Sequence, residues 1–516
     1  MKVKSIHLVF LFFLSLIFCF YFGSIGVFPI DSFAFFDSAN LINKGLIPFE
    51  DYWLSSGLLV DYLQSIFFRI FGVNWYSYVF HAAFINFIFT SFTYFFFLIV
   101  GLNNKYSLFY SSLISILSYS VVGVPFPDHH SIFLSIIGFY IFFFLSISKK
   151  DYLIGWFFLP IPFFLAFISK QVPASYIILL FFFTGLFYFF RKNNIKKLLY
   201  LIIGAFFIIL LFYLFLIINK ISVNNFLIQY LLFPITIGSS RVSGLTLESL
   251  IYKLIGEFKF ISLSLAILFY FFIKNYFNSK KNQILNTNNF LVLFFIIISI
   301  IFNQILTKNQ NFIFFLIPII LGISHSQLNF FKKERKILVI LILLLSIFTT
   351  FKYHLRFNID RKFMELENVD KSKYLNASII SEKLKGLKWI NPEFKGSAQQ
   401  EARLLKNAIN YLSQTSNNKI IITEYQFILS DINHNIYSPN RWYTRDGVSY
   451  PLLENKYYYY YKNFFIKILK KNNIKFIYTI YPLDIKSFDF ILEKSCIKTE
   501  KISDILTQYD IKSCKL

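Results

Sequence analysis

The chain has 516 residues, of which 56% are hydrophobic and only 15% are charged, and its formal net charge is +24. A soluble domain averages about 25% charged residues, so this composition excludes an ordinary soluble enzyme. The Lys and Arg residues lie in short loops between apolar runs and in the last third of the chain. That placement argues against a nucleic-acid partner, because it provides no continuous basic face.

Apolar runs recur along the first two thirds of the chain and stop near residue 352. Runs of roughly 18 residues are long enough to cross a hydrocarbon core about 30 Å thick. We therefore predict a polytopic α-helical membrane protein, with a transmembrane domain over 1–352 and an exported domain over 353–516. About eleven transmembrane helices are expected, at 5–27, 76–100, 106–123, 131–148, 152–168, 174–190, 198–218, 259–277, 289–307, 312–328 and 337–352.

The charges in the loops predict the direction of the helices. With Lys2 and Lys4 in the cytoplasm, alternation places the basic connections near 105, 149–150, 191–197, 280–281 and 332–336 on the same side. The opposite loops hold more Asp and Glu, as the positive-inside rule requires. We expect a bacterial inner (cell) membrane protein whose C-terminal domain is periplasmic or otherwise extracytoplasmic. Residues 5–27 also have the form of a signal peptide, but no small-x-small cleavage site follows.

The stretch 55–73 is apolar but contains Asp61, Gln64 and Arg69. Counting it as a span would invert every later loop and move the basic clusters outside. We therefore expect a helix lying along the outer membrane interface, within a first outer loop over 28–75.

The polar C-terminal third has a pattern typical of a small α/β domain. Helical spacing appears at 402–412 and 458–471, β-rich runs appear at 419–423 and 475–480, and a further helix is expected from 488–493. The segment 353–400 is expected to be a partly ordered linker. Cys496 and Cys514 both lie in this domain, where an oxidising compartment would allow a disulfide, but sequence alone leaves their pairing open.

The first outer loop carries the most informative motif. Asp31 follows the first span directly, and Phe35, Ala39 and Ile42 continue at helical spacing. A short helix is therefore expected there, and one interpretation makes Asp31 its N-terminal cap.

Taken as a whole, the loop resembles the GT-C superfamily of polyprenyl-phosphate-sugar-dependent glycosyltransferases, which includes protein O-mannosyltransferases and lipid A aminoarabinose transferases. Members of that superfamily often have Tyr at the position of Phe35 and Pro near Gly57. The residues that carry the resemblance are Asp31, Phe35, Ala39, Gly45, Pro48, Phe49, Asp51, Phe71 and Gly72.

The resemblance implies an inverting transferase that moves a sugar from a polyprenyl-phosphate donor to an outward-facing polysaccharide, lipid-linked glycan or protein. Such a donor holds its anomeric carbon at the membrane surface, where an acceptor hydroxyl needs a base. The resemblance implies that Asp31 is this base, with Asp37 as the nearest substitute. No soluble nucleotide sugar is required, and the sequence contains no Gly-rich phosphate loop.

Two further outer loops carry candidate donor-binding residues. Asp128 and His129 lie at a helix mouth, where they would bind the donor phosphate or a divalent metal ion; alternatively they are a helix cap and an interface histidine. Lys170 on the outer side opposes the positive-inside trend; it would contact the donor phosphate, or alternatively snorkel to the interface. The superfamily often has an acidic residue in the first of these loops and a Lys-Gln pair in the second, and this resemblance favours Asp128 and Lys170 as site residues.

Two candidates come from later segments. Arg241 lies among Gly and Ser residues, which suits a mobile lid over phosphate or sugar, or a plain solvated loop. Arg441 and Trp442 belong to the densest polar-aromatic cluster of the exported domain and are candidate acceptor-binding residues, unless the cluster is a structural loop.

Two other functions are compatible with this topology. A transporter or flippase of a lipid-linked glycan would carry charges within its spans near the midplane, whereas the acidic residues here cluster in outer loops. A glycan polymerase or ligase would share the compartment and the lipid substrate. Its catalytic loops are expected late in the chain and rich in Arg and His.

Overall fold

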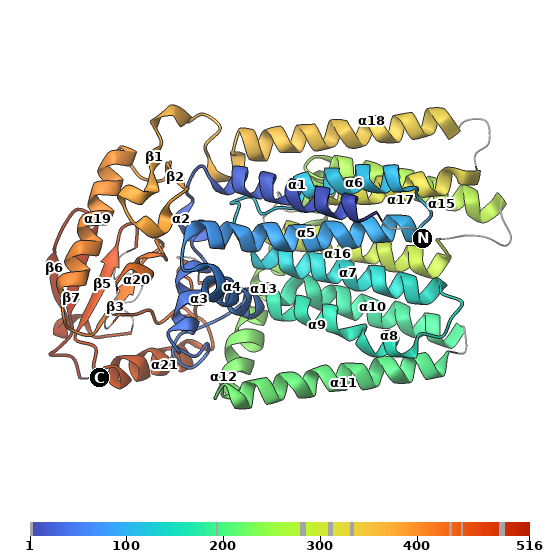
Figure 1. Ribbon diagram of the computed structural model, residues 1–516. Coiled ribbons are helices and arrows are strands. Elements are labelled where there is room, and N and C mark those ends of the chain that lie inside the picture. The colour runs from blue at the N-terminus through green and yellow to red at the C-terminus, as the bar shows by residue number, and fades with distance from the viewer. Residues whose placement is uncertain are drawn as a thin grey trace.

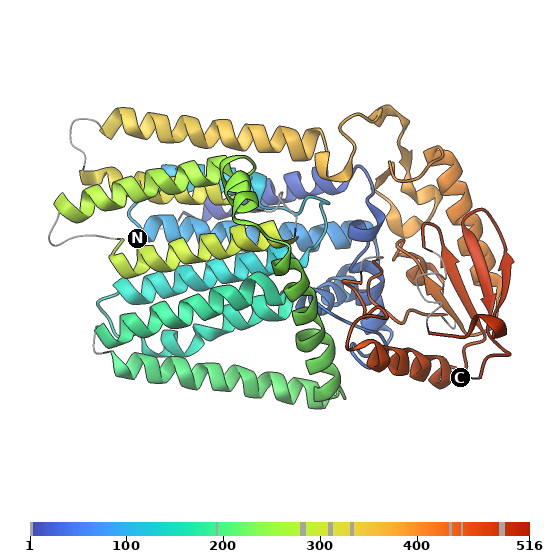
Figure 2. The same cartoon turned by 180° about the vertical axis from the view of Figure 1, so that it is seen from behind.

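The computed structural model describes residues 4–191, 194–278, 285–307, 313–330, 335–432, 436–444, 447–483 and 491–515. Long helices lie side by side in one bundle, and the C-terminal domain sits at one end of it, opposite the N-terminus (Figure 1). Seen from behind, α11 and α18 lie on opposite sides of the bundle (Figure 2).

The described residues contain eight helices that are long and apolar enough to cross a membrane. On α11, for example, Phe206 and Ile218 are 70% and 77% exposed, which is favourable only in an apolar surrounding. The protein is therefore membrane-embedded. The eight helices are α1 Ser5–Gly23, α5 Trp75–Ile99, α7 Pro127–Ile147, α10 Gln171–Arg191, α11 Ile195–Ile218, α15 Lys259–Asn278, α16 Thr287–Thr307 and α18 Arg335–His354.

The three remaining predicted spans form shorter helical segments. They are α6 Asn104–Leu117, α8 Leu153–Phe158 followed by α9 Pro160–Ser169, and α17 Leu316–Ser326. None reaches the length of about 20 residues that a straight crossing needs. Each predicted segment thus contains a helix, although residues 118–123 of the predicted span 106–123 are not helical. The count of eleven spans and their orientation stay predictions. The loop residues 280–281 and 332–334 lie outside the described residues.

Close backbone contact brings the first and second outer loops together. A Cβ atom on Gly123 would lie 2.3 Å from the Cα atom of Gly23, at the end of α1, so the contact requires glycine. Gly123 also has a φ of +72°, which glycine adopts without strain. Trp75 donates from Nε1 to the carbonyl of Gly23 at 2.8 Å. These contacts place the start of α7 beside the start of the first outer loop.

Short helices cover the end of the bundle that faces the C-terminal domain. The predicted interface helix is α4. Its buried side holds Asp61 and Gln64 together with apolar residues, whereas Ile66 and Ile70 are 48% and 65% exposed. Such exposed apolar side chains fit a lipid interface. These short elements are α2 Pro29–Ser32, α3 Phe36–Asn43, α4 Leu58–Phe71, α12 Val223–Phe226, a π-helical turn Leu227–Leu232, α13 Phe233–Ser243 and α14 Leu247–Ile255.

The C-terminal domain is built on a five-stranded mixed sheet with the order β4-β3-β5-β7-β6. Strand β3 (Lys419–Ile422) is buried along its length and runs parallel to β4 (Ile436–Tyr437) and β5 (Phe476–Ile480). Strand β7 (Leu506–Asp510) is antiparallel to β5 and to β6 (Lys498–Lys501).

Most predicted elements of this domain are confirmed. The predicted helices correspond to α19 (Ala398–Gln414) and α21 (Tyr458–Lys471), and both predicted strands form. The hairpin of β6 and β7 was not anticipated from the sequence. Of the helix expected at 488–493, residues 488–490 lie outside the described residues and 491–493 are not helical.

The segment 353–400 is a packed part of the structure, which corrects the expectation of a linker. Strands β1 (Leu375–Asn376) and β2 (Lys388–Trp389) pair within it, and Leu366 and Leu384 are fully buried. Backbone hydrogen bonds join it to the chain that leaves α1, since Gly26 donates to Lys388 at 3.0 Å. Short, irregular elements of this kind have no hydrophobic period that a sequence pattern would show. The other short elements are a π-helical turn at Leu355–Ile359, α20 (Ile428–Asp431) and 3₁₀ turns at 362–364, 371–373, 377–379, 382–384 and 494–496.

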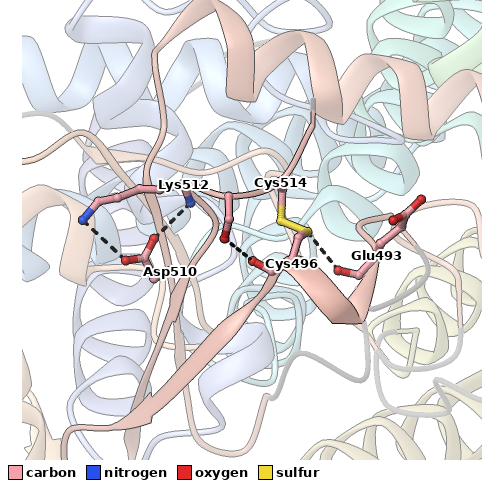
Figure 3. The surroundings of a disulfide bond; sticks show 6 residues. Glu493, Cys496, Asp510, Lys512 and Cys514 are labelled. Atoms are coloured by element: carbon pink, nitrogen blue, oxygen red, sulfur yellow. Dashed lines mark hydrogen bonds and ion pairs between the residues drawn. A yellow bond between two sulfur atoms is a disulfide. The ribbon is translucent and has the colours of Figure 1, made fainter.

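Cys496 and Cys514 form a disulfide with a Cα–Cα distance of 4.9 Å. The bond joins the start of β6 to the chain that leaves β7 (Figure 3). Its pairing, which the sequence left open, is settled by this contact. Cys19 is buried in α1 and unpaired.

Candidate active site

A cavity of about 360 Å³ lies where one end of the bundle meets the C-terminal domain. Its wall includes the first outer loop, the first turns of α7 and α10, helix α13 and the C-terminal domain. The predicted site residues that line it are Asp31, Asp128, Lys170, Arg241, Arg441 and Trp442. These six residues come from five separate segments of the chain, which thus meet at one place.

Asp31 lies in the single turn α2, which begins at Pro29. The helix expected to run on from Asp31 is interrupted, and α3 begins only at Phe36. Among the described residues, no backbone N–H donates to the Asp31 carboxylate, so the capping interpretation is wrong. The side chain is half-buried and lines the cavity.

The surroundings of Asp31 favour its protonated form more than water does. Burial is the main cause and raises the pKa of Asp31 to about 7. The carboxylate of Asp128 raises this pKa further, Lys170 lowers it, and Glu393 and Glu424 raise it. A carboxylate with a pKa near neutrality is well suited to accept a proton from a hydroxyl and later release it to water.

Asp128 and Lys170 form an ion pair with an Nζ–Oδ2 distance of 2.6 Å. Asp128 lies in the first turn of α7, where the helix dipole stabilises a negative charge. Lys170 lies between α9 and α10, and its side chain is 21% exposed, against 1% for Asp128. The lysine is therefore held at the cavity by a carboxylate rather than extended along the lipid. Its neighbour Gln171 donates to the carbonyls of Ser55 and Tyr230, which fixes this connection.

Arg241 supplies a second cation. It lies in the last turn of α13 and lines the cavity, half-buried. In the part of the chain that the structure describes, its guanidinium has no hydrogen-bond or ion-pair partner. A guanidinium with five N–H donors facing a cavity is suited to an anionic ligand, and to phosphate in particular.

Arg441 and Trp442 attach the C-terminal domain to the first outer loop. Trp442 donates from Nε1 to the carbonyl of Ile30 at 2.8 Å. The Arg441 guanidinium lies 4.5 Å from the ring centre of Phe35, and its Nε lies 4.0 Å from Oδ2 of Asp61. Both residues line the cavity, as predicted for acceptor contacts, but these polar atoms already position the residues next to Asp31.

Asp37, the substitute candidate for the base, does not line this cavity. Its carboxylate accepts hydrogen bonds from the backbone N–H groups of Leu429 at 3.1 Å and Ser430 at 2.9 Å. Asp37 therefore serves α20 of the C-terminal domain as an anchor to the first outer loop. Burial raises the pKa of Asp37 to about 7, although these two hydrogen bonds lower it.

The histidines beside Asp128 belong to the interior rather than to the cavity wall. His129 packs edge-on against Phe133, with ring centres 5.5 Å apart. The Nδ1 atom of His130 lies 2.9 Å from the carbonyl oxygen of Phe126, and its Nε2 atom lies 3.1 Å from Nε2 of His81. They hold the first turn of α7 in place. Among the described residues, no three His, Cys, Asp or Glu side chains gather as metal ligands would, so the divalent metal ion stays an untested expectation.

One residue of the cavity wall was not anticipated from the sequence. Asn303 of α16 is fully buried, and among the described residues neither its side-chain amide nitrogen nor its side-chain oxygen has a hydrogen-bond partner. Buried amides without partners are rare and costly. The signal was present in the sequence as an Asn-Gln pair near the end of an otherwise apolar run, where polar residues usually mark a functional site.

Comparison with known proteins adds no relative to this arrangement. No protein-family model matches the chain, and a search of curated proteins finds no match to it.

Proposed function

We propose that this protein is a membrane-embedded glycosyltransferase. It takes a sugar from a polyprenyl-phosphate donor and passes it to a hydroxyl of an outward-facing polysaccharide, lipid-linked glycan or protein. The observation that carries the proposal is the meeting of Asp31, Lys170 and Arg241 on one cavity at the end of the bundle. A base and two cations at that depth match a donor whose lipid tail lies in the membrane and whose phosphate lies at its surface.

Asp31 acts as the base. The acceptor oxygen forms a bond to the anomeric carbon while the bond from that carbon to the phosphate oxygen breaks, so the configuration at the carbon inverts. The proton of the hydroxyl passes to the Asp31 carboxylate. The leaving group departs as polyprenyl phosphate, and Asp31 then loses its proton to water, which its pKa of about 7 permits near neutral pH.

Lys170 and Arg241 stabilise the leaving phosphate. The negative charge on the phosphate grows as the bond to the sugar breaks, so fixed cations there lower the barrier. Asp128 sets the position of Lys170 through their 2.6 Å contact. Arg241 lacks such a contact among the described residues, which leaves all its donors for the ligand. Asn303 has both amide atoms available for the sugar or the phosphate.

The proposal places the cavity and the C-terminal domain outside the cytoplasm, in a bacterial inner membrane. The disulfide of Cys496 and Cys514 supports that side, because such bonds persist in oxidising compartments. The position of the cavity at the helix ends also favours a transferase over a transporter, whose binding site is expected near the midplane.

The test uses purified full-length protein in lipid nanodiscs with a panel of radiolabelled polyprenyl-phosphate sugars. Release of sugar from the donor is measured for the wild type, Asp31→Asn and Glu248→Gln. We expect Asp31→Asn to lose more than about a hundredfold in rate while it stays folded. Glu248→Gln is the matched control, because this carboxylate is exposed and lies on α14 away from the cavity. Full turnover by Asp31→Asn would rule out the assignment of the base.

A further inference from the structure

A second cavity, of about 480 Å³, lies beside the first and belongs mainly to the C-terminal domain. Ile30 and Thr444 line both cavities. The two spaces therefore adjoin at these side chains, close to Asp31. The volume lies in the range of roughly 300–1,000 Å³ that is usual for small-molecule sites. The remaining lining residues are Pro29, Asn391, Glu393, Phe394, Glu424, Tyr425, Tyr481 and Pro482.

The polar wall of the second cavity is held by a buried carboxylate. Glu401 is 1% exposed and accepts hydrogen bonds from Trp389 Nε1 at 2.8 Å, Asn391 Nδ2 at 2.7 Å and the Tyr425 hydroxyl at 2.7 Å. Asn391 in turn accepts from the backbone N–H of Glu393 at 3.1 Å. Three lining residues are thus fixed in place before any ligand arrives, which is the arrangement that a binding site needs.

The chemistry of the lining suits a sugar. The carboxylates of Glu393 and Glu424 are acceptors for hydroxyl hydrogen bonds. The rings of Phe394 and Tyr481 offer flat apolar faces, against which the C–H face of a sugar ring packs. A cavity of this size that combines hydrogen-bond acceptors with aromatic rings suits a hydroxyl-rich ligand.

Charge restricts the ligand further. The carboxylates of Glu393 and Glu424 lie on the wall of this cavity, and none of its described lining residues is a Lys or an Arg. A ligand that carries phosphate or carboxylate groups would meet like charge there. A neutral ligand would not be repelled.

We propose that the second cavity binds the acceptor of the transfer reaction, and that this acceptor is a neutral, hydroxyl-rich glycan. The inference rests on the proposed function and extends it to the class of acceptor. One end of the glycan lies against Phe394 and Tyr481, and its reacting hydroxyl passes Ile30 and Thr444 to reach Asp31. There the oxygen bonds to the anomeric carbon, its proton goes to the Asp31 carboxylate, and polyprenyl phosphate leaves.

The experiment separates the acceptor site from the donor site. Full-length protein in nanodiscs is given a polyprenyl-phosphate sugar and either water alone or one of three neutral probes, maltoheptaose, cellopentaose and chitopentaose. Hydrolysis of the donor by water needs the first cavity only, whereas transfer to a probe needs both. We expect Phe394→Ala to raise the KM for the probe about tenfold or more and to leave donor hydrolysis within about twofold.

A charge reversal tests the selectivity. Glu393 is exposed, so Glu393→Lys is expected to fold, and it should allow inhibition by penta-galacturonate at concentrations about tenfold below those the wild type requires. Glu382→Lys, at an exposed site of the same domain outside both cavities, is the matched control and should behave as the wild type.

The outcomes distinguish the two proposals. If the wild type hydrolyses no donor, the proposed function fails and this inference fails with it. If the wild type hydrolyses donor but uses none of the neutral probes, or if Phe394→Ala leaves the KM for the probe unchanged, only the acceptor site is overturned. Preference for penta-galacturonate as the acceptor would also overturn it.

Discussion

The Nζ atom of Lys170 lies 2.6 Å from Oδ2 of Asp128, and the carboxylate of this pair is almost completely buried. The two residues come from different outer loops, 42 positions apart in the chain. The pair joins the start of α7 to the connection between α9 and α10 and places a cation on the cavity. Both the stability of this end of the bundle and the proposed binding of phosphate depend on it.

Breaking this pair should destabilise the protein. Lys170→Met leaves the Asp128 carboxylate buried without its cation, and we expect the free energy of unfolding to fall by about 3 kcal/mol. This value is at the lower end of the range for buried pairs, because the lysine is partly exposed. The double variant Lys170→Met/Asp128→Asn should regain most of that stability without regaining turnover. Thermal unfolding in detergent and donor hydrolysis measure the two effects.

An exposed ion pair provides the control for that experiment. Lys362 and Glu367 lie 2.9 Å apart, with side chains 42% and 39% exposed. Lys362→Met should therefore change stability by less than about 1 kcal/mol. A Lys170→Met variant as stable as the wild type would contradict the structural role of the buried pair.

The rate of donor hydrolysis should rise with pH through the pKa of Asp31, which is about 7. Only the ionised carboxylate accepts a proton, so the rate at pH 6 should be about tenfold below its plateau at high pH. Asp128→Asn removes a negative neighbour that raises this pKa, so it should move the midpoint to lower pH. A profile of kcat/KM between pH 5 and pH 9 checks both expectations. If Asp128→Asn moved the midpoint of the pH profile to higher pH, the assignment of Asp31 as the base would be contradicted.

Asn303→Leu should separate stability from function. Because both amide atoms of Asn303 are buried without partners, replacement by an apolar side chain of similar size should leave stability unchanged or raise it. The KM for the donor should rise about tenfold, since the proposed contact is lost. Asn289 lies on the same helix and donates to Ser146 at 2.9 Å. Asn289→Leu should instead lower the free energy of unfolding by about 1 kcal/mol and leave the KM for the donor unchanged. If Asn303→Leu destabilised the protein and left the KM for the donor unchanged, Asn303 would not be a donor-binding residue.

The orientation of the bundle can be measured with introduced cysteines. The native cysteines are silent, because Cys19 is buried and the other two are joined in a disulfide. We expect an impermeant maleimide to label Glu248→Cys on intact spheroplasts and to label Lys149→Cys only after permeabilisation. Both positions are exposed in the structure. Labelling with the opposite preference would invert the predicted topology and place the cavity in the cytoplasm.

Local properties of the chain were predictable. The apolar runs became helices close to the expected bounds, because hydropathy and helical period depend on near neighbours in sequence. The same holds for α21, whose observed bounds Tyr458–Lys471 equal the predicted ones. Alternation of the predicted spans placed Asp31, Asp128, Lys170 and Arg241 on one side of the membrane, and in the structure these four residues line one cavity.

Partners distant in sequence were decided only by the tertiary structure. The sequence made Asp37 the substitute candidate for Asp31, but the fold pairs its carboxylate with the backbone of Leu429 and Ser430, almost four hundred positions later. Asn303 looked like part of an ordinary span until the fold placed it on the cavity wall. A sequence determines which residues prefer lipid, water or a helix. Which side chain receives which partner depends on distances that exist only after the helices and the C-terminal domain have packed together.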